Sequence, residues 1–578
     1  MRKSIKIYQS VFLLLVITLS ACKTETPADM ILTNGKILTV DANFTIAEAM
    51  AIKGDKIIAV GTNREIRKLA DRESKIIDAA GRTIIPGIID AHLHPEMASV
   101  SELEEPIPDV HSIAELLDWI RIETATKPEG EWIVFPKMFF TRLTELRQPS
   151  LSELDSVAPF HPVFLNGSFG GMINTAAMRA SGIDKNTDHP GILEDQGTGK
   201  LTGFIRASAF HLLKLPSPGS LSSGEREDAL LSMLLRYNRY GITSLCSGAG
   251  DYELYSMYRE LGRKGKLTTR ICQNILLRLD PGTSAGMLVD TLKSYSFVTG
   301  DGDEWARIGA LKVFLDGGIL TGTAFLREPW GDKAGTIFGI RDTTYRGVVN
   351  FSRDELFAIV SAAHENNWKF TAHCTGGGAV DLLLDVYEEV DAVKSIKERR
   401  FSVIHGNFFT DSAMQRMSKL GVYADLQPAW FYKDADAMTK ILGEERMQTF
   451  HPYRSLLDAG VILNGGSDHM VKWDADASIN PYNPFLAMWS AVTRTTERNS
   501  VIFPAQAITR EEALRMYTIH NAYASFEESL KGSIEPGKLA DVAILSEDFL
   551  DCPVNRIREI RSELTMVGGK IVYASEKY

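Results

Sequence analysis

The chain has 578 residues, of which 44% are hydrophobic and 24% are charged, a balance typical of a globular protein with a large core. Its 63 basic and 74 acidic side chains give a formal net charge of −11, and no basic tract stands out, so we expect no nucleic-acid partner. Beyond Cys22, the cysteines Cys246, Cys272, Cys374 and Cys552 form neither a Cys-x-x-Cys pair nor a disulfide framework. We expect them to be small buried hydrophobic residues.

The N-terminus resembles a lipoprotein signal. Basic residues precede the apolar stretch "VFLLLVITL" (Val11–Leu19), which is too short to span a membrane as a mature helix. The sequence "LSAC" follows and ends at Cys22. We predict a signal peptide over 1–21, lipidation of Cys22 and a tether over 22–28, which would anchor the protein to a membrane of the bacterial cell envelope. The alternative is an ordinary secretory signal with a chance cysteine.

The two ends of the chain carry similar strand patterns. "ILTNGKILTV" (Ile31–Val40) and "MVGGKIVYA" (Met566–Ala574) each place a Gly-Lys turn between short apolar runs. Further strand-like segments follow the first, and "GSIEPGKLADVAIL" begins at Gly532. We therefore predict that 29–85 and 530–578 together build one small β-sandwich domain.

Residues 86–529 alternate apolar strands with helical segments such as 353–367 and 510–526. Runs this apolar suit parallel strands that are covered on both faces. Eight such strands with helical crossovers predict an α/β fold, a (β/α)₈ TIM barrel. The predicted strands are 84–92, Gly241–Gly248, Arg270–Leu277, Ile308–Gly317, Lys369–Gly377, Phe401–Asn407, Gly421–Pro428 and Val461–Asp468.

The stretch between the first two predicted barrel strands is too long for one crossover, so we predict an insertion over about 98–225. It contains "SIAELLDWIRIETA", a helix expected to begin with a capping box between Ser112 and Glu115, and two strands, "WIVFPKM" and "PVFLNGS". The insertion follows the C-terminal end of a barrel strand. We therefore expect it at the barrel mouth, where active sites form.

Polar side chains occur where the predicted barrel strands end. These ends meet at one rim of a barrel, so the side chains are expected to line one pocket. Histidine nitrogens and carboxylate oxygens bind zinc and similar divalent metals, and His-x-His on a strand puts both imidazoles on one face. A lone buried histidine more often contacts backbone, so the prediction depends on the shared placement. The candidates are His92, His94, Lys312, His373, His405 and Asp468.

Lys312 is unusual among these candidates because it lies within the apolar run "GALKVFLDGGIL" (Gly309–Leu320). A buried ammonium is costly unless it is paired or loses its charge. One possibility is that the side chain turns outward or pairs with Asp316. The alternative is a chemical change that removes the positive charge.

The pattern resembles the amidohydrolase superfamily, the urease-related metal hydrolases. "PGIIDAHLH" (Pro86–His94) is close to its signature, and "HCTGG", "VIHG" and "GGSD" follow in order. In members with two metals a lysine of the fourth strand is carboxylated by CO₂, and the carbamate bridges both ions. The resemblance therefore implies a carbamate on Lys312 and two divalent metals, most simply two Zn²⁺. A one-metal variant is the alternative if Lys312 is not carboxylated.

Over nearly all of the mature chain the resemblance is to the branch of N-substituted formamide deformylases and exoenzyme-regulatory-type proteins. The blocks that carry it include Gln148–Leu165, Asn174–Ile183 and Gly199–Ile205. The chain departs from the branch pattern after the fifth-strand histidine, before the sixth-strand histidine, after the eighth-strand aspartate and in the insertion. The residues at these places are Cys374–Gly377, Ile404, His469, Met470, and Gly170 or Gly171. The metal ligands are kept, but the branch's substrates are not transferable.

The resemblance implies metal-dependent hydrolysis of an amide-type or formamide-type C–N bond in a small molecule. His92 and His94 would hold one metal, His373 and His405 the other, and Asp468 would act as a metal ligand and general base. Two alternatives stay open. One is an ester or lactone hydrolase, or an isomerase, on the same site; the other is a catalytically silent binding lipoprotein.

Aromatic residues are a further feature of the barrel sequence. "PAWFY" (Pro428–Tyr432) and Trp489 are candidates for an aromatic pocket, with ordinary packing between barrel and helix as the alternative.

Overall fold

The computed structural model describes residues 27–103, 106–195, 197–216, 221–280, 282–340 and 342–578. The predicted signal peptide and Cys22 lie outside these residues. In the described part of the chain, none of the helices has the length and apolar character needed to cross a membrane.

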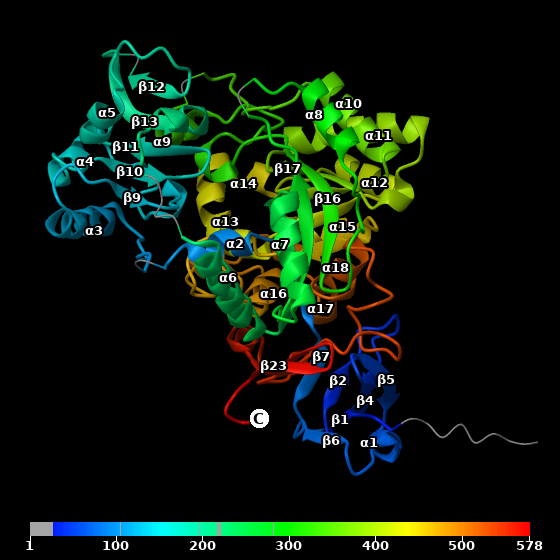
Figure 1. Cartoon of the computed structure of the whole chain (residues 1–578). Coiled ribbons are helices and arrows are strands. Elements are labelled where there is room, and N and C mark those ends of the chain that lie inside the picture. The colour runs from blue at the N-terminus through cyan, green and yellow to red at the C-terminus, as the bar shows by residue number, and fades with distance from the viewer. Residues whose placement is uncertain (1–26, 104–105, 196, 217–220, 281, 341) are drawn as a thin grey trace, which may run out of the picture.

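Eight parallel strands form a barrel at the centre of the molecule (Figure 1). Their order in the sheet follows their order in the chain, as a (β/α)₈ barrel requires, and every predicted barrel strand is represented. The predicted fold class is therefore confirmed. The strands are β8 (Ile88–Leu93), β14 (Ile242–Gly250), β15 (Arg270–Leu276), β16 (Ala306–Phe314), β17 (Phe370–Cys374), β18 (Ser402–His405), β19 (Tyr423–Leu426) and β20 (Leu463–Gly465).

Helices cover the outside of the barrel and bury their apolar faces against it. Complete capping boxes begin α6, α10 and α17, in which a Ser or Thr and a Glu satisfy each other's backbone N–H groups. The covering helices include α6 (Ser223–Asn238), α7 (Tyr252–Arg263), α8 (Ala285–Ser294), α10 (Arg353–Glu365), α11 (Gly377–Val393), α12 (Asp411–Leu420), α13 (Pro428–Leu442), α15 (Tyr453–Asp458), α16 (Pro484–Thr493), α17 (Arg510–Met516) and α18 (Ile519–Ala524).

The barrel closes between its first strand, β8, and its last, β20. Just beyond the C-terminal end of β20, the backbone N–H of Asp468 donates to the carbonyl of His92 at 2.6 Å. The N–H of His94 donates to the carbonyl of His469 at 2.7 Å. These two backbone bonds hold the residues that follow β20 directly against the end of β8.

At the opposite end of the same seam, the side chain of Asn521 joins the two strands. Its amide NH₂ donates to the carbonyls of Ile89 and Gly465, and its oxygen accepts the N–H of Gly465 at 3.2 Å. The helix predicted over 510–526 is divided into α17 and α18. The backbone at Thr518, the residue before α18, is not helical, with φ −134° and ψ −95°. The division therefore places Asn521 in the seam.

The strand predicted over 84–92 is also divided into two. Its first part, β7 (Thr83–Pro86), belongs to the β-sandwich, and its second part is the barrel strand β8. Gly87 joins them, and a Cβ atom at this position would lie 2.1 Å from Oγ1 of Thr243. Only glycine fits this close approach, so a single residue connects the β-sandwich to the first barrel strand.

Strands from both ends of the chain form the β-sandwich, as predicted, and they lie together in Figure 1. One sheet has the order β5-β4-β1-β6 and the other β23-β22-β21-β7-β2-β3. Their apolar side chains share one core, for example Met50 from the first sheet and Val542 from the second. The strands are β1 (Met30–Thr33), β2 (Lys36–Leu38), β3 (Ile46–Ala47), β4 (Ala49–Lys53), β5 (Lys56–Gly61), β6 (Lys75–Asp78), β21 (Val542–Leu545), β22 (Ser562–Val567) and β23 (Lys570–Ala574).

The insertion forms a five-stranded sheet with the order β12-β13-β11-β10-β9, flanked by helices, to one side of the barrel (Figure 1). Ser112 caps α3, but Glu115 accepts the N–H of His111 instead, so only half of the predicted capping box forms. A paired Arg142 and Asp434, 2.6 Å apart, fixes the insertion to α13. The elements are α3 (Ile113–Thr126), β9 (Ile133–Phe135), α4 (Leu151–Val157), β10 (Val163–Asn166), β11 (Gly170–Ile173), α5 (Thr175–Ser181), β12 (Ile192–Asp195) and β13 (Lys200–Arg206).

The contacts that Asn521 makes between β8 and β20 predict an effect on thermal stability. Asn521→Ala leaves two buried carbonyls and one N–H without their partner, and each unsatisfied buried group costs about 1–3 kcal/mol. We expect the midpoint of thermal unfolding to fall by several degrees. Asn186→Ala is the control, because the amide of Asn186 is exposed and contacts only Asp184 in its own turn. Equal unfolding midpoints for the two variants would contradict a structural role for Asn521.

Candidate metal centre

The six candidate residues lie together at the C-terminal rim of the barrel, and all are buried. They come from five strands or from the residues directly after them, so the barrel topology alone brings them together. By position, His92 is in β8 and His94 follows it, Lys312 is in β16, His373 in β17, His405 ends β18, and Asp468 follows β20.

Four of these side chains meet around Asp468 and His92. Oδ1 of Asp468 lies 3.2 Å from Nε2 of His94 and 3.5 Å from Nε2 of His92. Nζ of Lys312 is 3.2 Å from the same nitrogen of His92. One ligand atom from each of His92, His94 and Asp468 lies within 4.8 Å of the others, a spacing that fits one metal ion.

The other two histidines extend this cluster. The ring of His405 lies 4.6 Å from that of His373 and 5.3 Å from that of His92, measured between centroids. Nε2 of His373 contacts the carbonyl of Gly317 at 3.1 Å, and Nδ1 of His405 contacts Oε1 of Gln427 at 2.8 Å. Because these oxygens only accept, the contacting nitrogens carry the protons. Nδ1 of His373 and Nε2 of His405 are therefore free to bind a metal.

Electrostatics set the protonation states that metal binding needs. Burial, with a smaller contribution from the charge of Lys312, lowers the pKa of His92 and His373 well below the usual value. Burial lowers the pKa of His405 to about 4. Burial alone would raise the pKa of Asp468, but a hydrogen bond from the neighbouring imidazole and nearby positive charges lower it. The imidazoles of His92, His373 and His405 are thus neutral, and the carboxylate of Asp468 is ionised, at neutral pH.

Lys312 has no carboxylate partner within 4.0 Å among the described residues, and burial lowers its pKa to about 8. The alternative partner considered from the sequence, Asp316, is engaged elsewhere. It accepts backbone N–H groups at 2.8 to 3.0 Å, including those of Thr375 and Gly376. Pairing of Lys312 with Asp316 is therefore wrong. The buried ammonium borders the histidine cluster, and the charges of Asp468 and Asp425 act on it only from beyond 4.0 Å, so the site fits an anion-forming modification of this lysine.

The backbone at this site adopts uncommon conformations. Asp468 has a φ of 53° and His405 a φ of 72°, both in the left-handed region that non-glycine residues rarely occupy. Gly248 at the end of β14 approaches the cluster so closely that a Cβ atom there would lie 2.6 Å from Nε2 of His92. Strained backbone and a tight glycine contact are typical of functional sites.

A cavity of about 210 Å³ opens from the cluster. Its walls are mainly apolar, and its volume lies below the range of about 300–1,000 Å³ typical of drug-sized ligands, which favours a small substrate. Trp430 stacks on His405 with ring centroids 4.6 Å apart and lines this cavity, whereas Trp489 is buried in the barrel core. The apolar lining residues are Met97, Phe139, Phe169, Phe314, Ile319, Leu320, Trp430 and Met470.

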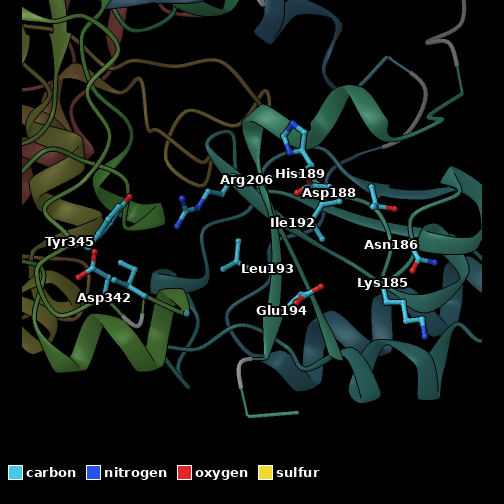
Figure 2. A pocket seen from close by; sticks show the side chains of 13 residues that line it. Lys185, Asn186, Asp188, His189, Ile192, Leu193, Glu194, Arg206, Asp342 and Tyr345 are labelled. Atoms are coloured by element: carbon cyan, nitrogen blue, oxygen red, sulfur yellow. The ribbon is translucent and has the colours of Figure 1, made fainter. Parts of the chain in front are cut away.

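A second cavity is larger, about 540 Å³, and none of its lining residues belongs to the metal-ligand cluster. Figure 2 shows this lining. This cavity lies between β12 and the loop that carries Asp342 and Tyr345. Within the described part of the chain, the metal-ligand cluster occurs only at His92, His94 and Asp468. We therefore assign the chemistry to the smaller cavity.

Several residues of the site were missed from the sequence. Gln427 is the last residue but one of the seventh predicted strand, so the strand-end rule that found the histidines also signals it. Glu96, whose Oε1 lies 4.0 Å from Nδ1 of His94, extends the His-x-His spacing by two residues. Lys137 and Phe169 enter from the insertion, and no pattern in the sequence marks them.

His469 and Asn480 also lie beside Asp468, but in different roles. Both ring nitrogens of His469 are engaged, by Tyr237 at 2.9 Å and by the carbonyl of Lys472 at 2.6 Å. Asn480 donates its side-chain NH₂ to the carbonyl of Asp468 at 2.7 Å and to its Oδ2 at 3.3 Å. His469 is therefore part of the packing, whereas Asn480 orients the carboxylate.

Comparison with known proteins identifies the family. The amidohydrolase family matches residues 75–573. The N-substituted formamide deformylase of Arthrobacter pascens is 30% identical over 557 residues, covering 94% of this chain and 98% of that protein. The putative amidohydrolase YtcJ of Bacillus subtilis is 24% identical, covering 91% and 96%.

Solved structures share the fold. An uncharacterised metal-dependent hydrolase from Pyrococcus horikoshii superposes with a TM-score of 0.66 at 22% identity, over 91% of this chain and 99% of that chain. Atrazine chlorohydrolase TrzN from Arthrobacter aurescens, complexed with zinc, gives a TM-score of 0.53 at 15% identity, over 94% and 95%. At these identities the likeness concerns the fold alone.

The chain belongs to the amidohydrolase family. It is a metal-dependent hydrolase that acts on carbon–nitrogen bonds, and its substrates are small molecules.

The contact between Gln427 and His405 predicts an effect on metal affinity. Gln427→Leu keeps the approximate size but removes the acceptor that fixes the tautomer of His405. Loss of such a contact typically lowers metal affinity about 10- to 100-fold. We expect a fall of this size in zinc affinity, measured by competition with a chelator. Gln448→Leu, at an exposed position, is the control; unchanged affinity in Gln427→Leu would show that this contact does not orient His405.

Proposed function

We propose that this protein hydrolyses an amide-type or formamide-type C–N bond in a small molecule and that Asp468 is its general base. The observation that carries the proposal is the convergence of four histidines, one carboxylate and one buried lysine on a single small cavity. The relative named N-substituted formamide deformylase, 30% identical over nearly its whole length, supports the choice of bond.

The donor set fits two divalent metal ions, and we propose two Zn²⁺. His92 and His94 would hold one, His373 and His405 the other, and Asp468 lies within reach of the first pair. Such ions supply a Lewis acid for the scissile carbonyl and lower the pKa of a coordinated water toward about 7.

Lys312 would be carboxylated in this proposal. The neutral amine at Nζ forms an N–C bond with CO₂ and releases one proton, so the ammonium is replaced by a carbamate anion. The carbamate oxygens are metal ligands, whereas an ammonium has only N–H donors. Among the described residues no carboxylate lies within 4.0 Å of Nζ of Lys312, which supports this step, because the modification removes a buried positive charge that has no partner in contact.

Asp468 is placed to move the proton that catalysis requires. Its carboxylate is ionised, borders the cavity and is oriented by Asn480, while Oδ1 faces His92 and His94. It would accept the proton of the attacking water at Oδ1 and return it to the leaving nitrogen.

Two variants separate metal binding from proton transfer. Wild-type protein purified with zinc and bicarbonate is expected to hold close to two metals per chain. Asp468→Asn is expected to keep most of the metal, because the histidines and the carbamate remain, while turnover of N-substituted formamides falls about 10²- to 10⁴-fold. Lys312→Ala is expected to lose metal and turnover together.

Elemental analysis and turnover are measured side by side on the three proteins. A wild-type metal content near zero would contradict the proposed metal-dependent hydrolysis. A content near one ion per chain would contradict a bridging role of Lys312. Full turnover in Asp468→Asn would show that the base is another group. Lys312→Ala with both metals retained would make the lysine structural.

We also propose that the mature protein is anchored to a membrane of the bacterial cell envelope through a lipid on Cys22. The proposal rests on the sequence "LSAC" and the short apolar stretch before it. Cys22→Ser is expected to release the protein from the membrane fraction with unchanged specific activity, because Cys22 is not among the site residues. Fractionation followed by an activity assay checks this; a wild type already found in the soluble fraction would overturn it.

A further inference from the structure

Lys137 is a second buried lysine at the metal centre, and it comes from the insertion rather than from the barrel. It follows β9, is 8% exposed, and lines the same cavity as Asp468 and Asn480. Its Nζ contacts Sδ of Met470 at 2.7 Å and lies 5.9 Å from the ring centroid of Phe139. A thioether sulfur is only a weak acceptor, so this contact does not compensate an ammonium.

Two neighbouring cations at the barrel mouth differ from Lys137, because each has an acidic partner. Arg142 pairs with Asp434, and Lys433 with Glu497. Among the described residues, no carboxylate lies within 4.0 Å of Nζ of Lys137. Burial lowers the pKa of this amine to about 8, so it is still mainly protonated at neutral pH.

A buried charge without an opposite charge in contact is costly, and active sites contain such groups where a ligand supplies that charge. Because Lys137 lines the substrate cavity, the substrate is the ligand that would supply the opposite charge. A single ammonium matches one negative charge, which favours a carboxylate over a phosphate dianion. The other cation of the cavity, Lys312, belongs to the histidine cluster.

We propose that Lys137 binds a carboxylate of the substrate, so that the enzyme acts on small anionic N-acyl or N-formyl compounds. This rests on the proposed function, because it assumes that the scissile bond lies at the histidine cluster. The remaining walls are mainly apolar side chains, which suit a hydrophobic group beside the carboxylate. An N-acylated amino acid with an apolar side chain combines these features: an amide at the metal centre, a carboxylate at Lys137 and a side chain against Phe169, Phe314 and Ile319.

The first test is binding without turnover. The probes are N-methylsulfonyl-L-leucine, whose sulfonamide is not hydrolysed, and its carboxamide, which differs only in charge. Calorimetry on the zinc-loaded full chain is expected to show about 10- to 100-fold tighter binding of the acid, the range for a hydrogen bond to a charged group. Lys137→Met, of similar length and without charge, is expected to abolish this preference while leaving carboxamide binding unchanged.

Lys433→Met is the matched control, because it removes a positive charge near the barrel mouth from a residue outside the cavity, and it should keep the wild-type preference. A preference that persists in Lys137→Met, or is absent from the wild type, overturns the proposal. Equal loss of preference in Lys433→Met also overturns it, since the effect would then come from net charge.

Turnover of N-formyl-L-leucine and N-formyl-L-leucinamide distinguishes this inference from the proposed function. Lys137→Met is expected to lose kcat/KM about 10- to 100-fold for the acid only. If the wild type hydrolyses both substrates with equal kcat/KM, the amide-hydrolase proposal stands and the role of Lys137 fails. If it hydrolyses neither but still binds the acid probe selectively, Lys137 stands and the choice of bond fails.

Discussion

The closure of the barrel between β8 and the residues after β20 is the constraint on which the metal centre depends. Two backbone hydrogen bonds, from Asp468 to His92 and from His94 to His469, join the first and last strands at their C-terminal ends. They hold the carboxylate of Asp468 within 3.5 Å of both imidazoles. The left-handed backbone of Asp468 is kept in place by the same contacts. The contacts that close the barrel therefore also set the geometry of the metal ligands.

Burial then determines the chemistry of the groups that closure brings together. Low solvent access keeps the imidazoles of His92, His373 and His405 neutral, and the neighbouring donors keep Asp468 ionised, which are the states that bind a divalent metal. The same burial makes an ammonium costly at Lys312 and at Lys137. In our proposals, this cost is removed in a different way at each lysine. Lys312 becomes an anion by carboxylation, whereas Lys137 remains a cation that a substrate carboxylate neutralises.

The insertion and the barrel contribute different parts of the site. The barrel strands and the residues directly after them supply every candidate metal ligand, and the insertion supplies Lys137, Phe139 and Phe169 to the cavity wall. The ion pair between Arg142 of the insertion and Asp434 of α13 fixes the insertion to the barrel. Because the strand ends set the metal centre independently of the insertion, its side chains can change substrate preference without changing the ligands.

The sequence by itself determined the eight-stranded barrel, the β-sandwich and the six candidate residues, because apolar periodicity and strand-end positions are local features of the chain. It did not determine the break at Gly87 or the division of α17 from α18, since both arise from contacts with distant residues such as Thr243 and Gly465. Only the tertiary structure brought Lys137 to the metal centre. The packing of the insertion against the barrel decided this, and such packing has no periodic signature in the sequence.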